Sequence, residues 1–224
     1  MIPLTCEMKE LKYVKDMVVK AAEIEIAGAG VKLEYAVGTM IEIPRAALLA
    51  DKLAEVAEKY GLGIFEDDPY GYVRYEGEHL PSIFSFDKAG NTLYAGSFSK
   101  ILAPGTRTGW VVGAPEILRQ MNVFKQSTDL CSSSVDQALV ADYCKKGYLT
   151  QHLPKIIANY RVRRDSMEES MKRHLSPLGV TWVKPQGGFF YWINVPGINT
   201  DVLMRRALDK KVAFIQGSAF EVEK

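Results

Sequence analysis

The sequence is poor in residues that hold metals and disulfides, and it has no long apolar stretch. Its three cysteines, Cys6, Cys131 and Cys144, form no Cys-x-x-Cys pair, a pattern typical of reduced thiols in a cytoplasmic protein. The three histidines are far apart and predict no metal site. No apolar run approaches the roughly 20 residues that a membrane-spanning helix needs. The N-terminus lacks the basic and apolar regions of a secretion signal, so we expect a cytoplasmic protein.

An excess of charge of one sign is also lacking. The 28 Lys and Arg residues nearly balance the 27 Asp and Glu residues, which leaves a net charge of +1. A nearly neutral chain has no bulk attraction to nucleic acid or to an anionic membrane, so neither is expected as a partner. The 224 residues, 47% of them hydrophobic, suffice for one large core, or for one core and a small satellite.

Apolar spacing and turn residues predict alternating helices and strands in the first half of the chain. The expected helices cover residues 8–27 and 44–60, and the expected strands cover residues 31–37, 62–65, 92–97 and 107–112. This alternation predicts an α/β fold with a partial, mostly parallel sheet flanked by helices. Ligands of such sheets bind beyond the C-terminal ends of the strands. The acidic run Glu66-Asp67-Asp68 and Lys100 fall at such ends.

The second half has a different pattern. Helices are expected over residues 116–125, 133–146, 150–175 and 200–210, and β-type runs over residues 180–183, 188–194 and 212–215. A long helix should therefore lead into a small α+β unit at the C-terminal end.

The run Gly-Ser-Phe-Ser-Lys that ends at Lys100 carries the most specific chemistry. A lysine that forms a Schiff base with pyridoxal 5'-phosphate needs an acid near the ring nitrogen of the cofactor and a cation near its phosphate. Lys100, Asp67 and Arg107 have the right chemical types. Glu66 and Asp68 compete with Asp67 for the acidic role. Each residue could also be an ordinary surface charge.

Several runs together resemble the fold-type I aminotransferases that depend on pyridoxal 5'-phosphate, in the branch of 2-aminoadipate and multi-substrate enzymes. The runs are Glu66-Asp-Asp-Pro-Tyr-Gly-Tyr, Leu80-Pro-Ser, Tyr94-Ala-Gly-Ser-Phe-Ser-Lys, Pro104-Gly-Thr-Arg-Thr-Gly-Trp and Pro185-Gln-Gly-Gly-Phe. They follow the order and spacing of the family, and the resemblance extends from about Leu53 to Phe220. It implies a two-domain subunit, usually in a homodimer, that transfers an amino group between an amino acid and a 2-oxo acid.

The resemblance also implies a role for each matching residue. Lys100 would bind the cofactor covalently and shuttle the proton of transamination. Asp67 would hold the proton on the pyridine nitrogen, and Tyr70 would donate to the phenolic oxygen of the cofactor. Ser97 and Arg107 would bind its phosphate, and the planar fork of an arginine suits two oxygens.

Residues 1–53 resemble a different family, the phosphoenolpyruvate-binding barrel of pyruvate phosphate dikinase. The resemblance rests on the first four residues, a helix start at Lys9 and the run Gly38-Thr-Met-Ile-Glu-Ile-Pro-Arg. It implies Glu42 as a magnesium ligand, but the Asn-Asp pair that would complete the site has no counterpart, so no metal is expected. The sequence thus predicts a chimera, natural or engineered. Its segments are a barrel-like βα segment that completes the sheet (1–53), a transferase core (54–149), and the long helix with a small, incomplete domain (150–224).

Three functions remain open from the sequence. The chain could be an aminotransferase, a chimera that keeps the lysine constellation without turnover, or a residual phosphoenolpyruvate and magnesium site. The phosphate loop, the ring-stacking aromatic residue and the carboxylate-binding arginine of the aminotransferases have no counterpart in this sequence. Binding energy that orients a substrate cannot come from absent residues, so we expect little or no turnover from this chain by itself.

Overall fold

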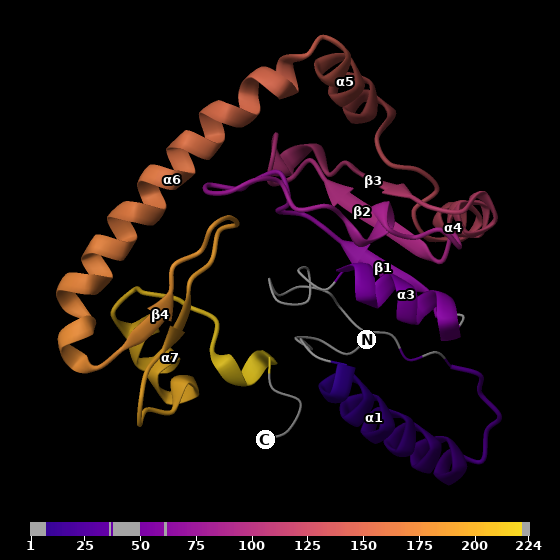
Figure 1. Cartoon of the computed structure of the whole chain (residues 1–224), viewed down its shortest axis with the longest axis horizontal. Helices are drawn as coiled ribbons and strands as arrows, with labels where there is room; N and C mark the ends of the chain where they lie inside the picture. The colour runs from indigo at the N-terminus through magenta and orange to yellow at the C-terminus, as the bar shows by residue number, and fades with distance from the viewer. Residues whose placement is uncertain (1–7, 36, 38–49, 61, 221–224) are drawn as a thin grey trace. The chain divides into compact units, whose positions relative to one another are not determined.

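The computed structural model describes residues 8–35, 37, 50–60 and 62–220 (Figure 1). The chain forms two compact units. Unit 1 comprises Met1–Tyr72 and Glu78–His152, and unit 2 comprises Val73–Gly77 and Leu153–Lys224. The division into segments 1–53, 54–149 and 150–224 stays a prediction.

The described helices of unit 1 are α1 (Met8–Ala29), α3 (Ala50–Tyr60), α4 (Pro115–Thr128) and α5 (Ser134–Lys145). They confirm the predicted helices, although residues 44–49 of the second one lie outside the described residues. The predicted strand over residues 31–37 is wrong, because residues 31–35 and 37 belong to no strand. The side chains of Val31, Leu33 and Tyr35 are exposed. A β-type run forms a strand only where its backbone finds a partner.

The sheet of unit 1 has the order β1-β2-β3, formed by β1 (Ile64–Asp67), β2 (Thr92–Ser97) and β3 (Gly109–Val112). Its presence between helices confirms the α/β class. A mostly parallel sheet was expected; in the described sheet β1 and β2 are parallel, and β3 runs antiparallel to β2. The connection over residues 98–108 is too short for the crossover of about a dozen residues or more that parallel neighbours need.

A small apolar core holds this sheet against its neighbours. Ala54 of α3 and Ile83 of the short helix η1 (Ile83–Ser85) are buried together, and Ile64 of β1 packs against them. This core fixes the start of β1, and so it sets the position of the acidic run at the other end of the strand.

Unit 2 contains most of the long helix α6 (Tyr148–His174), a hairpin of β4 (Thr181–Val183) and β5 (Trp192–Asn194), and α7 (Thr200–Asp209). The prediction of a long helix followed by a small α+β unit is confirmed. The β-type run over residues 212–215 is not a strand. Val212 and Ile215 are exposed there, and no described strand pairs with this run.

A buried arginine organises unit 2. Arg164 of α6 is 6% exposed; its guanidinium lies 2.6 Å from Glu76 and 2.7 Å from Asp165. It also donates to the carbonyl of Pro185 at 2.9 Å and lies 5.2 Å from the centre of the Tyr75 ring. One side chain thus joins α6, the segment Val73–Gly77 and the loop before β5.

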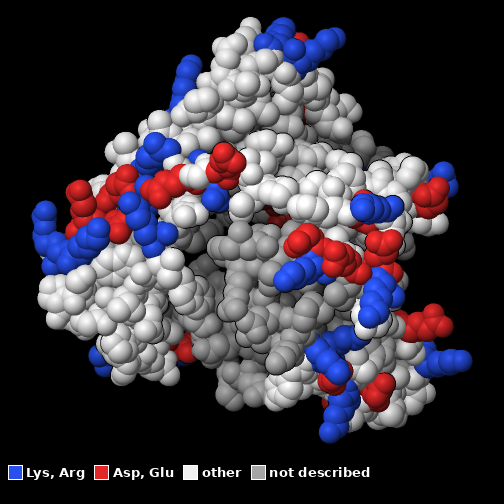
Figure 2. All heavy atoms as spheres, viewed as in Figure 1, with Lys and Arg blue, Asp and Glu red and all other residues white. Residues whose placement is uncertain are grey.

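The charged surface is mixed. On the face seen in Figure 2, Lys and Arg side chains lie among Asp and Glu side chains rather than forming a large basic patch. Within the described part of the chain, no helix is long and apolar enough to cross a membrane.

Candidate functional site

The backbone register brings the predicted site residues to one edge of the unit 1 sheet. Asp67 ends β1, and Ser97 ends the parallel strand β2. Ser97 is paired with Gly109, the first residue of the antiparallel strand β3. The connection between β2 and β3 therefore lies at the edge where β1 and β2 end. Lys100 and Arg107 are both in this connection.

The first of the three consecutive acids is a structural cap. Glu66 is buried, and its two carboxylate oxygens accept the backbone N–H groups of Ile83 at 2.9 Å and Phe84 at 3.0 Å. Burial raises the pKa of Glu66 above its ordinary value, although these two hydrogen bonds oppose the shift. With both oxygens engaged at the start of η1, Glu66 is not available to a ligand at the sheet edge.

The third acid is also engaged. One oxygen of Asp68 accepts the N–H of Gly71 at 2.6 Å, and the other accepts the hydroxyl of Tyr94 at 3.0 Å. The Asp67 carboxylate, by contrast, is exposed and makes no hydrogen bond or ion pair with any described residue. Of the three competitors, Asp67 alone has a carboxylate open to a ligand within the described structure.

Lys100 lies in a helical turn directly after β2. The turn closes where the N–H groups of Leu102 and Ala103 donate to the carbonyl of Phe98 at 2.8 and 3.1 Å, and Ile101, within the turn, is buried. The half-buried Lys100 places its Nζ 5.9 Å from the centre of the Tyr70 ring, near the outer limit of a cation–π contact.

Tyr70 joins the lysine to the open acid. Burial raises the pKa of the Tyr70 hydroxyl, and the negative charge of Asp67 raises it further. The hydroxyl of Tyr70 therefore keeps its proton at neutral pH and can donate a hydrogen bond. Lys100, Tyr70 and Asp67 form a connected group within unit 1.

The two predicted phosphate ligands are at the same edge, but no described contact joins them to that group. Ser97 Oγ accepts the N–H of Ser99 at 3.1 Å, which leaves its hydroxyl proton free to donate. Arg107 is exposed, with a left-handed backbone at φ 47°. Its guanidinium makes one described hydrogen bond, from Nη1 to the carbonyl of Pro104 at 3.3 Å, so most of the side-chain donors remain available.

A close packing contact holds this edge together. A Cβ atom on Gly96 would lie 2.2 Å from the Trp110 ring of β3, so only glycine fits beneath it. The Trp110 ring in turn lies 4.8 Å from the ring of Phe98, in the turn that carries Lys100. The glycine of the Gly-Ser-Phe-Ser-Lys run thus serves the packing that supports the lysine turn.

These groups fit pyridoxal 5'-phosphate by chemical type. The edge offers an amine, an open carboxylate, a phenol that keeps its proton, a free hydroxyl donor and a guanidinium. The sequence did not reveal that Glu66 and Asp68 are engaged by backbone and tyrosine donors. The alternation of side chains along a strand could have distinguished Asp67 from Glu66, since it places the two residues on opposite faces of the sheet.

Glu42, the magnesium ligand that the resemblance to the phosphoenolpyruvate-binding barrel implies, lies outside the described residues. Within the described ranges, no group of three or more His, Cys, Asp and Glu side chains could hold a metal ion.

Comparison with protein families gives two matches. The profile of aminotransferase class I and II matches residues 47–224, and that of the PEP-binding domain of PEP-utilising enzymes matches residues 1–64. The two matches share residues 47–64, which include α3.

Individual relatives carry the names of enzymes and of a regulator. Aromatic-amino-acid aminotransferase 1 of Thermococcus litoralis is 39% identical over 98% of this chain and 52% of its own length. An uncharacterised HTH-type transcriptional regulator of Bacillus subtilis, YdfD, is 36% identical over 78% of this chain and 36% of its own length.

A solved structure, the multiple substrate aminotransferase of Thermococcus profundus, superposes with a TM-score of 0.78 at 38% identity, over 98% of this chain and 54% of that one. The chain therefore spans about half the length of the enzymes it matches. Both alignments extend into the first quarter of the chain, beyond the resemblance that the sequence motifs indicated. The match to residues 47–224 covers most of the chain, which therefore belongs to the aminotransferase class I and II family.

Proposed function

We propose that this chain binds pyridoxal 5'-phosphate through Lys100 and, by lineage, transfers an amino group between an amino acid and a 2-oxo acid. The observation that carries the proposal is the group at the sheet edge. Lys100 Nζ lies 5.9 Å from the Tyr70 ring, and the pKa of Tyr70 is raised by burial and further by the charge of Asp67, the open carboxylate of the acidic run. The enzymes that this chain resembles support the same reading.

The roles follow from the chemistry of each side chain. Pyridoxal 5'-phosphate, when bound, supplies an aldehyde for the lysine and a cationic ring that withdraws electrons from the substrate. Lys100 provides the amine and moves a proton at the substrate Cα. The carboxylate of Asp67 holds a proton on the ring nitrogen. Tyr70 donates its hydroxyl proton as a hydrogen bond to the phenolic oxygen.

The end of β2 and its connection to β3 provide the phosphate-binding groups. Ser97 donates its free hydroxyl proton, and Arg107 offers a planar fork that matches two phosphate oxygens.

The proposed substrates are aromatic amino acids and 2-aminoadipate, the classes that the names of two relatives give, with a 2-oxo acid as the amino acceptor. The test is amino transfer by the purified chain supplied with the cofactor, measured as product amino acid by mass spectrometry. Lys100→Ala should abolish transfer. Lys88→Ala is the matched control, because Lys88 is exposed and precedes the opposite end of β2. Transfer that survives Lys100→Ala would overturn the assignment.

A second candidate is cofactor binding without turnover. The similarity to a protein named as a transcriptional regulator favours it, because that protein contains a segment like this chain. The two candidates differ in one result. Saturable cofactor uptake at Lys100 without transfer to any 2-oxo acid would support the second and reject the first.

The origin of the first segment is a separate proposal. The match of residues 1–64 to a PEP-binding domain supports a chimera whose joint lies in the shared residues 47–64. A residual magnesium site at Glu42 would show itself as magnesium-dependent binding of oxalate or phosphoenolpyruvate that Glu42→Ala removes. Equal binding by the wild type and the variant would reject this site.

We further propose that the chain forms a homodimer in the cytoplasm, because aminotransferases of this family commonly form homodimers. Light scattering should then give twice the 25.0 kDa chain mass, and a monomer at micromolar concentration would contradict the dimer.

A further inference from the structure

The Asp68 carboxylate connects the sheet to the turn that carries Tyr70. One oxygen accepts the hydroxyl of Tyr94, in the middle of β2, at 3.0 Å. The other accepts the N–H of Gly71 at 2.6 Å. The backbone N–H of Asp68 donates to Ala95 at 2.9 Å, which continues the β1–β2 ladder by one residue. The Asp68 side chain thus connects Gly71 to Tyr94 of β2. Tyr70 lies in the turn between Asp68 and Gly71.

The turn closes tightly around this carboxylate. A Cβ atom on Gly71 would lie 2.1 Å from Oδ2 of Asp68, so a side chain at this position would displace the carboxylate. The chain from Asp68 to Gly71 has little freedom while the contact holds, and Pro69 restricts it further. The position of Tyr70, and hence its distance from Lys100, depends on this closure.

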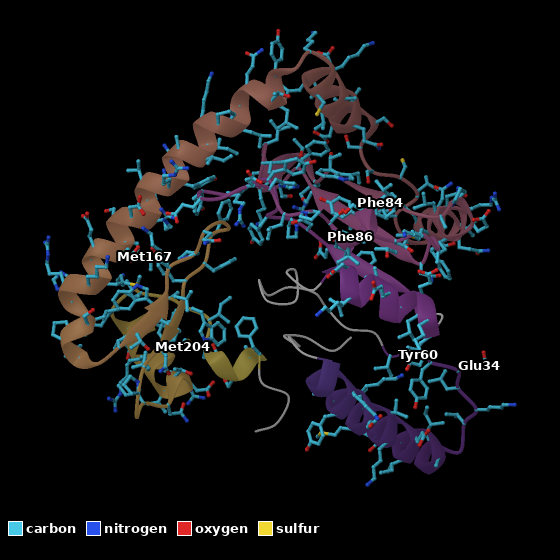
Figure 3. All side chains as sticks on the ribbon, in the orientation of Figure 1. Glu34, Tyr60, Phe84, Phe86, Met167 and Met204 are labelled. Atoms are coloured by element: carbon cyan, nitrogen blue, oxygen red, sulfur yellow. The ribbon has the colours of Figure 1, made fainter. Side chains whose placement is uncertain are left out.

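Tyr94 is a fixed partner for Asp68. Its ring lies 6.5 Å from that of Phe84, which Figure 3 labels beside the sheet. Phe84 is held in turn by the carboxylate of Glu66. Burial raises the pKa of the Tyr94 hydroxyl, and the charge of Asp68 raises it further, so the hydroxyl remains a donor. The chain of contacts leads from η1 through β2 to the Tyr70 turn.

We infer that Asp68 is a positioning residue, which works with Tyr94 and Gly71 to hold Tyr70 beside Lys100 for the cofactor. This inference rests on the proposed cofactor site. Asp68 would not touch the cofactor. It would act through Tyr70, while Asp67 remains the carboxylate that the cofactor meets.

Tyr94→Phe tests the inference with the least disturbance, because it removes one hydroxyl and keeps the charge of Asp68. The matched control is Tyr191→Phe in unit 2, whose partly buried hydroxyl donates to the carbonyl of Arg164 at 2.8 Å. Losing a hydrogen bond to a charged acceptor should weaken pyridoxal 5'-phosphate binding by up to about tenfold. The control should bind as the wild type does. Equal binding by Tyr94→Phe and the wild type would overturn the inference.

A measurement without cofactor separates this inference from the proposed function. With ¹³Cζ-labelled tyrosine, the Tyr70 resonance, assigned through Tyr70→Phe, should move in Tyr94→Phe and stay in place in Tyr191→Phe. Asp68→Asn, which keeps the shape of the side chain, should move it in a second, independent variant.

The two measurements distinguish failure of the proposed function from failure of the positioning role. If the wild type takes up no cofactor, the proposed function fails, and the Tyr70 resonance still decides the positioning role. A resonance that stays in place in both Tyr94→Phe and Asp68→Asn would overturn it. A merely structural role would lower the urea midpoint of unfolding without moving that resonance in the folded protein.

Discussion

Replacing Glu66 should cost far more stability than replacing the neighbouring Asp67. Glu66 is 9% exposed, and both of its oxygens accept backbone N–H groups, from Ile83 and Phe84. Glu66→Ala leaves these two donors unpaired, at a cost of about 1–3 kcal/mol for each buried group. Because the Phe84 N–H is only partly buried, we expect a total loss of about 3 kcal/mol. Asp67→Ala should cost no more than about 0.5 kcal/mol, as is usual for surface positions.

The pH dependence of Glu66→Gln gives a second readout of the same group. Burial raises the pKa of Glu66 in the folded state above the ordinary value of 4.5. A raised pKa means that the stabilisation is fully present below about pH 4.5 and is lost as the pH rises through the folded-state pKa. Glutamine does not titrate in this range. The stability of the wild type relative to Glu66→Gln should therefore fall as the pH rises.

The assay must report on unit 1, because a chain of two compact units need not unfold in one step. Trp110 lies in β3 of unit 1, and the other two tryptophans, Trp182 and Trp192, lie in unit 2. Urea unfolding followed by Trp110 fluorescence, with the other two changed to phenylalanine, isolates the relevant transition. The reasoning is refuted if Glu66→Ala shifts this midpoint no further than Asp67→Ala does.

Two further perturbations test other hydrogen-bonded charges. Burial raises the pKa of Asp87, but the backbone N–H groups of Thr92, Ala89 and Gly90 outweigh this effect and hold the pKa below its ordinary value. This stabilisation is present above about pH 4 and is lost as the pH falls through the folded-state pKa. Asp87→Asn should thus cost about 1–2 kcal/mol at pH 7, and urea titrations should show the gap closing as the pH falls below the ordinary carboxyl pKa of 3.8. Arg164→Ala removes the contacts of this side chain with Glu76, Asp165 and the Pro185 carbonyl; because the two carboxylates are 45% and 44% exposed and stay hydrated, unit 2 should lose about 2–3 kcal/mol. Fluorescence of Trp182 during unfolding measures this loss, and a loss below about 1 kcal/mol would contradict the organising role of Arg164.

Local patterns predict the elements that are stabilised by their own sequence and by near neighbours. The span of β2, residues 92–97, is predicted with its observed bounds, because a short β-type run there lies between clear turn residues. The small α+β unit after α6 also follows from spacing. The fold class can therefore be derived from the order of apolar patterns along the chain.

The incorrect predictions concern segments whose structure depends on partners elsewhere in the chain. The runs over residues 31–37 and 212–215 have strand-like composition, but no described strand pairs with them. The direction of β3 followed from the length of its connection rather than from its composition.

The candidate site shows the same limit. Residue types indicated Lys100, Asp67 and Arg107, but they could not rank Asp67 above its acidic neighbours. That ranking came from Glu66 engaging the backbone of η1 and from Asp68 engaging Tyr94.

The most direct test of the central claim is the site of covalent cofactor attachment. The purified chain is incubated with limiting pyridoxal 5'-phosphate, reduced with borohydride and mapped by peptide mass spectrometry. We predict that Lys100 carries most of the adduct, that Asp67→Asn and Arg107→Ala reduce its share, and that Lys88 is modified only slowly. Lys100 labelled no faster than Lys88 would contradict the account.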